Sequence, residues 1–523
     1  MCRSLFSHLV LVAALLLTAA WPPASLAQSQ QNTLRIRLNA DIRSTDPGMN
    51  RDANTDAVVL HMVEGLVAYR EDTSVAPLLA QSIQVSPDGK VYTFKLRPNL
   101  KFHNGAPVTA DDVLFAWNRY MKPENNWRCV VDFDGRGISK VVKTEARDPL
   151  TVVFTLEQPA ALFLATMART DCGGTGIYHR SSLDADGKWQ DPVGTGPFKM
   201  GDRKRGQYVE LQRFEAYAAL PGKRDGNTGN KTTELAKVRF VVIPDESAAK
   251  AALLSGAIDM NFNIGEEDLP EYKERKDISV AMSPSMDLVG MLFQTRDPLL
   301  KDVRIRRAIA LALDVPQIVE AVSFGSAKPN RSVIPVASGF HAAAQAEVPK
   351  RNIAAAKKLL AEAGYKGEAI KILTTKRYSG LFEIAVLAQA MALEAGIKID
   401  VEVLDWATLL DRYTKGNYQA MSFTYSARFD PSLSYQMISG LKDLRPARVW
   451  ESPEALELVD KSMVATDRAE RQALFNKLDV KLREDVPAIF MFSGGKTSAA
   501  KFYVKGYQGW AAGLPRAWGV SVR

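Results

Sequence analysis

A single arginine in a polar turn raises the first question about chemistry in this sequence. The stretch TYSARFDPS, residues 424–432, places Arg428 two positions before the Asp430-Pro431 turn, among small, hydroxylated and aromatic residues. A guanidinium is always charged and carries a planar fork of donors that matches a carboxylate or a phosphate. In an enclosed cleft Arg428 would therefore favour an anion and oppose an ammonium group. The alternative is an arginine that is solvated or paired with a carboxylate such as Asp430.

The common catalytic motifs are incomplete. Ser493 in MFSGGK would need the pattern Gly-x-Ser-x-Gly, but Met491 stands at the position of the first glycine. The run GGKT, residues 494–497, resembles half of a phosphate-binding loop, but Phe490 replaces its leading glycine. These motifs therefore give no support to an enzyme, and an exported hydrolase is disfavoured.

The histidines give no metal-binding pattern. His61, His103, His179 and His341 are isolated, and no two of them have the i, i+4 spacing that puts two ligands on one helical face. We therefore expect no metal site and no cofactor.

The N-terminus has the layout of a secretory signal peptide. Arg3 is followed by an apolar run from Leu9 to Ala20 and then by Ser25-Leu26-Ala27, a small-x-small cleavage site. The apolar run is shorter than the roughly 20 residues of a membrane-spanning helix, which disfavours an anchor. We expect residues 1–27 to be removed near Ala27 and the mature protein to be periplasmic or secreted.

The basic excess of the chain is spread along its length. The formal net charge is +8, but lysine and arginine do not form blocks. A nucleic-acid surface would need such clusters, so we expect no nucleic-acid partner. The length of 523 residues suggests two or three domains after export.

Two cysteines remain after the leader. Cys129 and Cys172 would close a loop of about forty residues, which in an oxidising compartment would contribute roughly 3–4 kcal/mol of stability as a disulfide. Two free buried thiols are the alternative, because the sequence does not give the spacing that a bridge requires.

Strand and helix patterns alternate along the chain. KVYTFKLRP (90–98), TVVFTL (151–156) and IKIDVEV (397–403) have the two-residue period of strands. Helices are predicted after Thr109, with Asp112 completing a capping box, and from Asn352 to Gly364. The polar, Gly-rich segment 220–234 is predicted to be an exposed loop. The chain is therefore a mixed α/β protein.

Long segments of the sequence resemble one family, the periplasmic dipeptide- and oligopeptide-binding proteins of ATP-driven importers, known as solute-binding protein family 5. The longest is VAPLLAQSIQVSPDGKVYTFKLRPNLKFHNGAPVTADDVLFAWNRY, residues 75–120. The resemblance continues in sequence order through STDPGMN (44–50), MVEGLVAYR (62–70), DPVGTGPFKM (191–200), ALLSGAIDM (252–260), KDVRIRRAIALALD (301–314), AAAKKLLAEAGY (354–365) and REDVPAIFMF (483–492). It spans nearly the whole mature chain.

The resemblance implies a two-lobe periplasmic binding protein fold, type II, cluster C, in which the lobes close over a ligand. Lobe I would comprise residues 28–285 and the C-terminal return 497–523, with an extra subdomain inserted at about 60–185. Lobe II would comprise residues 286–496.

The same resemblance suggests ligand contacts. Peptide-binding members place an aspartate before the Asp-Pro turn to hold the ligand's amine, and Ala427 occupies that position here. Arg377 in TTKRYSG resembles a family arginine that meets the ligand's carboxyl end, and Trp406 matches a tryptophan that packs on the ligand. The candidate ligand-binding residues are Arg428, Trp406, Arg377, Tyr425 and Tyr378.

These residues suggest the function. We expect a monomeric, non-enzymatic receptor that delivers a peptide-like or anionic small ligand to the permease and ATPase subunits of an ABC importer. The site would contain two cationic side chains, Arg428 and Arg377, and it lacks the aspartate that holds a ligand's amine. An acidic or blocked peptide, a glutathione-like compound or an opine-type conjugate would fit such a site. A chemosensory receptor that presents the ligand and a peptide-binding chaperone are the alternatives.

Overall fold

The computed structural model describes residues 32–376, 378, 380–425 and 428–523. The predicted signal peptide, residues 1–27, therefore lies outside the described residues. Within them, no helix combines the length and the apolar character needed to cross a membrane.

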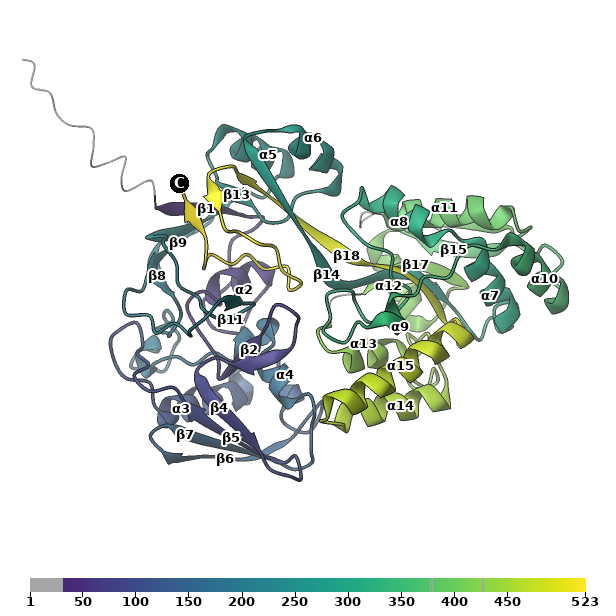
Figure 1. Cartoon of the computed structure of the whole chain (residues 1–523). Coiled ribbons are helices and arrows are strands. Elements are labelled where there is room, and N and C mark those ends of the chain that lie inside the picture. Colours follow the sequence, from purple (N-terminus) through teal and green to yellow (C-terminus); the bar gives the residue numbers. More distant parts are fainter. Residues whose placement is uncertain (1–31, 377, 379, 426–427) are drawn as a thin grey trace, which may run out of the picture.

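A ten-stranded mixed sheet runs through the molecule (Figure 1). Its strands, in spatial order, are β16 (Ile399–Val403), β15 (Ile370–Thr374), β17 (Ala420–Tyr425), β14 (Ile278–Phe293), β18 (Ala488–Lys501), β13 (Met260–Asn261), β1 (Thr33–Leu38), β12 (Lys237–Val242), β9 (Tyr208–Arg213) and β8 (Phe198–Lys204).

The two longest strands of this sheet, β14 and β18, connect two parts of the molecule. They pair antiparallel from Ile278 opposite Lys501 to Leu292 opposite Ala488. The first part contains the elements before β14 and the chain after β18, and the second part contains the elements between these strands. In Figure 1 the teal β14 and the yellow β18 run side by side from one part to the other.

The first part also contains a four-stranded antiparallel sheet with its own core. The strand order is β4 (Ala80–Val85), β5 (Val91–Leu96), β7 (Thr151–Leu156) and β6 (Val141–Asp148). Phe94 of β5 and Phe154 of β7 are buried and contact each other, and the buried Trp117 packs edge-to-face on Phe154. The other helices and short strands of this part are α2 (Ala53–Val59), α3 (Ala110–Met121), α4 (Phe163–Met167), α5 (Glu246–Ser255), α6 (Leu269–Glu274), β2 (Val67–Tyr69), β3 (Val75–Pro77), β10 (Arg224–Asp225), β11 (Thr228–Gly229), β19 (Val504–Lys505) and β20 (Ser521–Val522).

The second part follows an alternating strand and helix pattern. Strand β15 pairs parallel with both β16 and β17, and α11 and α12 connect these strands. Parallel neighbours need such crossover connections. The helices of this part are α7 (Val303–Ala312), α8 (Val315–Ser323), α9 (Ala343–Ala346), α10 (Ile353–Ala363), α11 (Leu381–Leu393), α12 (Trp406–Lys415), α13 (Pro431–Ile438), α14 (Pro453–Val464) and α15 (Arg468–Asp485).

The structure confirms the strands that were predicted from a two-residue period and the helices that were predicted from their capping residues. The predicted strands correspond to β5, β7 and β16. Asp112 accepts hydrogen bonds from the backbone N–H and the hydroxyl of Thr109 at the start of α3. Helix α10 begins after Asn352, whose side chain accepts from the Ala355 N–H, and ends at Gly364 in a left-handed conformation. The chain is a mixed α/β protein.

The segment 220–234 is not the exposed loop that its composition predicted. It contains the hairpin of β10 and β11, and the side chain of Lys231 is only 2% exposed. The Lys231 ammonium donates to Glu64 Oε1 at 2.8 Å and lies 4.7 Å from the ring centroid of Trp518. The prediction was wrong because polar residues can be buried when charged partners from distant segments satisfy them.

Cys129 and Cys172 form a disulfide, with a Cα–Cα distance of 5.7 Å and a sequence separation of 43. Both sulfurs are buried beside the aromatic core of the first part. The bond ties the short helical turn Val130–Asp132 to the turn Thr170–Thr175.

Replacing both cysteines by alanine is expected to lower the free energy of unfolding by about 4 kcal/mol, because the open loop has more conformational freedom in the unfolded chain. Urea denaturation of the oxidised wild type, the reduced wild type and the double variant measures this change. The two forms without the bond should agree, and a midpoint equal to that of the oxidised protein would contradict the prediction.

Replacing Lys231 by methionine is expected to cost about 3–5 kcal/mol of stability, because Glu64 would be left as a buried charge without its cation. Lys140→Met is the matched control, since the Lys140–Glu157 pair is exposed and should contribute less than about 1 kcal/mol. Equal losses in the two variants would show that burial of the Lys231–Glu64 pair has no special effect.

Candidate functional site

A cleft of about 1060 Å³ lies between the two parts. The first part contributes residues 51–56, Tyr69, 128–138, 169–171 and 511–514 to its walls, and the second part contributes residues from 428 to 463. Asp287 of β14 and Lys496 of β18 complete the lining at the connecting strands. The volume is that of a site for a small molecule or a short peptide.

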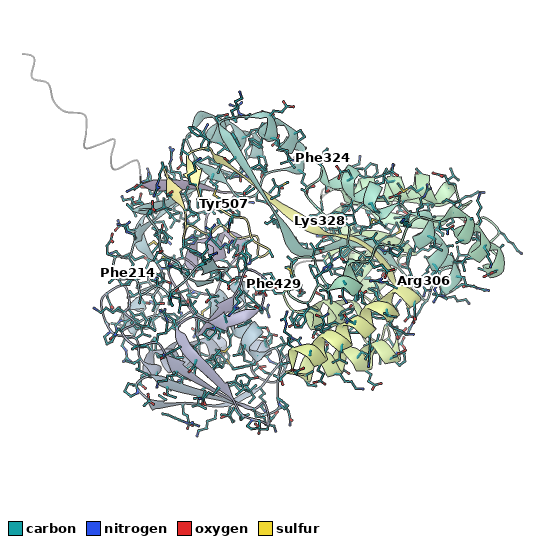
Figure 2. All side chains as sticks on the ribbon, in the orientation of Figure 1. Phe214, Arg306, Phe324, Lys328, Phe429 and Tyr507 are labelled. Carbon is teal, nitrogen blue, oxygen red and sulfur yellow. A yellow bond between two sulfur atoms is a disulfide. The ribbon has the colours of Figure 1, made fainter. Side chains whose placement is uncertain are left out.

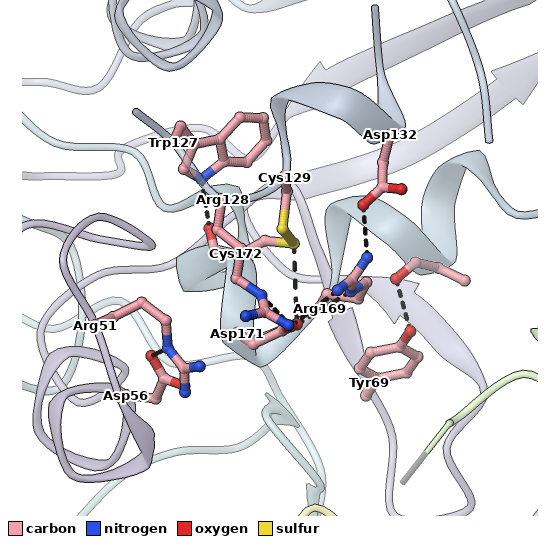
Figure 3. A network of polar contacts seen from close by, with 11 residues as sticks. Arg51, Asp56, Tyr69, Trp127, Arg128, Cys129, Asp132, Arg169, Asp171 and Cys172 are labelled. Carbon is pink, nitrogen blue, oxygen red and sulfur yellow. Dashed lines mark hydrogen bonds and ion pairs between the residues drawn. A yellow bond between two sulfur atoms is a disulfide. The ribbon is translucent and has the colours of Figure 1, made fainter. Parts of the chain in front are cut away.

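The disulfide positions a charged network on the first-part wall (Figure 3). It joins Cys129 to Cys172, so that the preceding residues, Arg128 and Asp171, come together from segments far apart in sequence. Arg128 Nε donates to Asp171 Oδ2 at 2.9 Å. The covalent link therefore fixes one ion pair at the edge of the cleft.

Arg169 extends this network. Its guanidinium donates to Asp132 Oδ2 at 2.7 Å and makes two bonds to Asp171, at 3.0 and 2.8 Å. Burial alone would raise the pKa of Asp171, but the Arg169 and Arg128 guanidinium groups hold it below its ordinary value. Asp171 therefore stays ionised between two arginines.

A second pair, Arg51 and Asp56, lies beside this network at the start of α2. Arg51 Nε donates to Asp56 Oδ1 at 3.0 Å. Burial raises the pKa of Asp56 to about 7, although the Arg51 charge opposes this shift. The charge of this wall therefore changes near neutral pH.

On the second part, Arg428 and Phe429 line the cleft where the chain passes from β17 to α13. The Arg428 side chain is exposed to the cleft. Its pKa is lowered because surrounding protein reduces its solvation and because Arg169 lies across from it. Asp430, by contrast, caps α13 and accepts from Arg471 Nη2 at 2.7 Å in a buried pair.

Phe429 marks the place where the two parts touch, and Figure 2 shows it at their boundary. Its ring centroid lies 4.8 Å from that of Tyr69, in an edge-to-face contact, and 6.3 Å from that of Trp510. The Gly339 N–H donates to the Asp72 carbonyl at 2.9 Å, also between the parts. These contacts between the two parts, next to Arg428 in sequence, therefore bound the cleft at Phe429.

The other predicted site residues lie apart from this cleft or outside the described residues. Trp406 begins α12, with its ring centroid 4.7 Å from Tyr378 and 5.6 Å from Phe423. Tyr425 is 5% exposed and packs in the same aromatic cluster. None of these aromatic side chains is among the described residues that line the cleft, so their role as ligand contacts stays a prediction. Arg377 and Ala427 fall outside the described residues.

Sequence reasoning missed most of the charged lining. Arg128, Asp171 and Arg169 stand next to or near the two cysteines, so the disulfide could have suggested that they meet. Arg445, in the segment after α13, had no such signal. Local sequence does not show which side a loop arginine faces.

The structure offers no metal centre in the part of the chain that it describes. Cys129, Asp171 and Cys172 bring ligand-type atoms together, but both sulfurs belong to the disulfide and are not thiolates. No other such group of three or more occurs among the described residues.

The chemistry of the cleft is therefore that of anion binding. Among its described lining residues, seven are basic and four are acidic. The basic residues are Arg51, Arg128, Arg136, Arg169, Arg428, Arg445 and Lys496, and the acidic ones are Asp56, Asp132, Asp171 and Asp287. Apolar side chains such as Leu433 and Met463 provide surface for the body of a ligand.

Known proteins resemble this chain over most of its length. The probable D,D-dipeptide-binding periplasmic protein DdpA of Escherichia coli is 28% identical over 502 residues, which cover 93% of each chain. The glutathione-binding protein GsiB of Escherichia coli is 26% identical over 376 residues, covering 71% of this chain and 69% of that protein. The structure of HbpA2 from Haemophilus parasuis superposes with a TM-score of 0.81 at 24% identity, covering 94% of this chain and all of that one.

The structural likeness confirms the predicted fold class, because the chain, with its large central α/β sheet, also superposes on the periplasmic murein tripeptide-binding protein MppA, with a TM-score of 0.78 at 20% identity that covers 94% of this chain and 98% of that one. The family model described as bacterial extracellular solute-binding proteins, family 5 Middle, matches residues 74–443. The chain therefore belongs to family 5 of the bacterial extracellular solute-binding proteins, the substrate-binding proteins of ABC transporters.

Proposed function

We propose that this substrate-binding protein captures an anionic, peptide-like small molecule in the cleft between its two parts and delivers it to the permease and ATPase subunits of an ABC importer. The observation that carries this proposal is the cleft lining, in which basic side chains outnumber carboxylates and Arg428 faces the space from the second part. The named ligands of the relatives, a D,D-dipeptide and glutathione, support the peptide-like character. The protein acts as a binding protein and not as an enzyme.

The proposed mechanism is closure of two lobes about the connecting strands. We assign lobe I to residues 28–285 and 497–523, with an inserted subdomain at about 60–185, and lobe II to residues 286–496. The pairing of β14 with β18 supports this division, because its register shifts between Pro284 and Leu288. The mature protein, cleaved near Ala27, works as a periplasmic monomer.

Arg428 is the proposed selectivity residue. Its fixed fork of donors suits a carboxylate, and its charge opposes the free amine of an ordinary peptide. Trp406, Tyr425, Tyr378 and Arg377 retain their proposed role as further ligand contacts, which would require a rearrangement of their aromatic cluster when ligand binds.

Calorimetric titration of the mature protein tests the ligand class. N-acetylated acidic dipeptides should bind more tightly than neutral dipeptides with free amines, and a preference for the neutral dipeptides would overturn the proposal. Arg428→Ala should weaken the acidic ligand by about 1.5–3 kcal/mol, the range of a hydrogen bond to a charged group. Arg304→Ala is the control, because Arg304 pairs with Asp302 on α7, outside the cleft.

The affinity for an anion should rise as the pH falls through about 7. Asp56 takes up a proton near this pH, and its neutral form removes a negative charge from the cleft wall. The charged groups that face it are Arg51, Asp52 and Asp171. Titrations between pH 6 and 8 with a ligand of constant charge measure the effect, which Asp56→Asn should abolish. An unchanged pH profile in that variant would show that another group is responsible.

A further inference from the structure

One side chain of the second part packs against the core of the first part. Phe429 contacts the buried cluster that contains Tyr69 and Trp510. Both partner rings are held by their polar atoms. The Tyr69 hydroxyl donates to the Ala165 carbonyl at 2.6 Å (Figure 3), and Trp510 Nε1 donates to the Glu71 carbonyl at 3.2 Å. The rings that Phe429 meets on the first part are therefore fixed in place.

A second cavity adjoins the cleft at this aromatic contact. It has a volume of about 190 Å³. Tyr69 and Phe429 line both this cavity and the cleft, and they are the only described residues that the two linings share. The second cavity is smaller than the roughly 300–1,000 Å³ of a typical ligand site, and it has room for about six water molecules. Its size therefore suits one end of a ligand and not a whole ligand.

The second cavity also differs from the cleft in its chemistry. Its described lining contains two acidic and two basic residues, whereas basic residues outnumber acidic ones in the cleft. Asp430 and Arg471, one of each kind, form a buried pair at 2.7 Å. Apolar surface comes from Val75, Ala161, Leu164, Ala165 and Phe340. This lining suits an uncharged, largely apolar group.

The backbone next to Phe429 is anchored on the second part. Asp430 follows it directly and caps α13, where its side chain accepts from the Ser432 N–H at 2.9 Å and from Arg471 Nη2 at 2.7 Å. The Gly339 N–H, at the edge of the second cavity, donates to the Asp72 carbonyl of the first part at 2.9 Å. These contacts restrict the position of the Phe429 ring, which borders both cavities.

We propose that the contact between Tyr69 and Phe429 is a partition that limits the length of the ligand, which makes Phe429 a specificity-determining residue. This inference rests on the proposed function and adds a length limit to its preference for anions. With the ring in place, the ligand is confined to the cleft of about 1060 Å³. Without the ring, the second cavity becomes an extension of the cleft, and an uncharged residue at the end of a longer peptide occupies it.

A purely structural role for Phe429 has a different consequence. If the ring only holds the two parts together, its removal weakens ligands of every length by the same factor. Removal of a partition instead changes the ratio of the affinities for peptides of consecutive lengths. This ratio is the informative measurement, because a common loss of affinity cancels in it.

Calorimetric titration with three series of alanine peptides of increasing length measures the ratio. Two series are N-acetylated and contain one glutamate, at the N-terminal end in one series and at the C-terminal end in the other. The third series has free amines and no glutamate. In the wild type, the affinity should stop increasing at a limiting length. In Phe429→Ala, the next longer peptide should gain about fourfold in affinity relative to the limiting peptide, the factor for burial of one methylene-sized group.

Matched variants separate the ring from other effects of the substitution. Phe429→Leu also lacks the ring and should shift the limit in the same direction by a smaller amount. Phe429→Tyr keeps the ring and should keep the wild-type limit. Phe502→Ala is the control, because Phe502 is 52% exposed and lines neither cavity. Circular dichroism of each variant verifies that the fold is intact.

The outcomes distinguish this inference from the proposed function. If the wild type binds the acidic peptides and both ringless variants keep its length limit, the partition is overturned and the anion-binding function stands. If the wild type prefers the neutral peptides, the anion-binding function is overturned, and the length limit in the third series still decides the partition. A wild type without a length limit in any series would overturn the partition, and binding of none of the peptides would overturn both proposals.

Discussion

The pairing of β14 with β18 is the constraint on which the rest of the structure depends. These strands belong to one continuous sheet, so the backbone hydrogen bonds that hold each part together also connect the parts. The register shifts between Pro284 and Leu288, and at this irregularity Asp287 and Lys496 enter the cleft lining. A β-bulge bends a strand without breaking the sheet. The same local irregularity therefore places charges of the connecting strands in the cleft lining.

The first-part wall depends on a covalent bond for its arrangement of charges. Arg128 and Asp171 lie on irregular turns, which have few hydrogen bonds of their own to fix side-chain positions. The Cys129–Cys172 bond holds these turns together, and both cysteines are buried in the same aromatic core. Arg169 then connects Asp171 to Asp132. Because the charges satisfy one another, this wall can be dense in arginines without a large net repulsion.

Strands and helix ends could be predicted from the sequence, because patterns of neighbouring residues encode them. The two-residue period predicted β5 and β7, and the residues Thr109 and Asn352 predicted helix starts. Contacts between distant segments could not be predicted in this way. Lys231 and Glu64 are 167 residues apart, and only the packed fold shows that they meet. Arg428 could be found because it adjoins a recognisable turn, whereas Arg445 lies in a loop without such a marker.

The excess of basic over acidic residues in the cleft lining bears on the proposed selection of a ligand. On the first-part wall, paired charges offer hydrogen bonds to many polar ligands, and they gain little from the net charge of any of them. Across the described lining as a whole, seven basic residues outnumber four acidic ones, so the cleft gains Coulomb energy from a negative charge that it encloses. In the proposed closure of the two parts, exclusion of water strengthens this attraction, because the local dielectric constant falls.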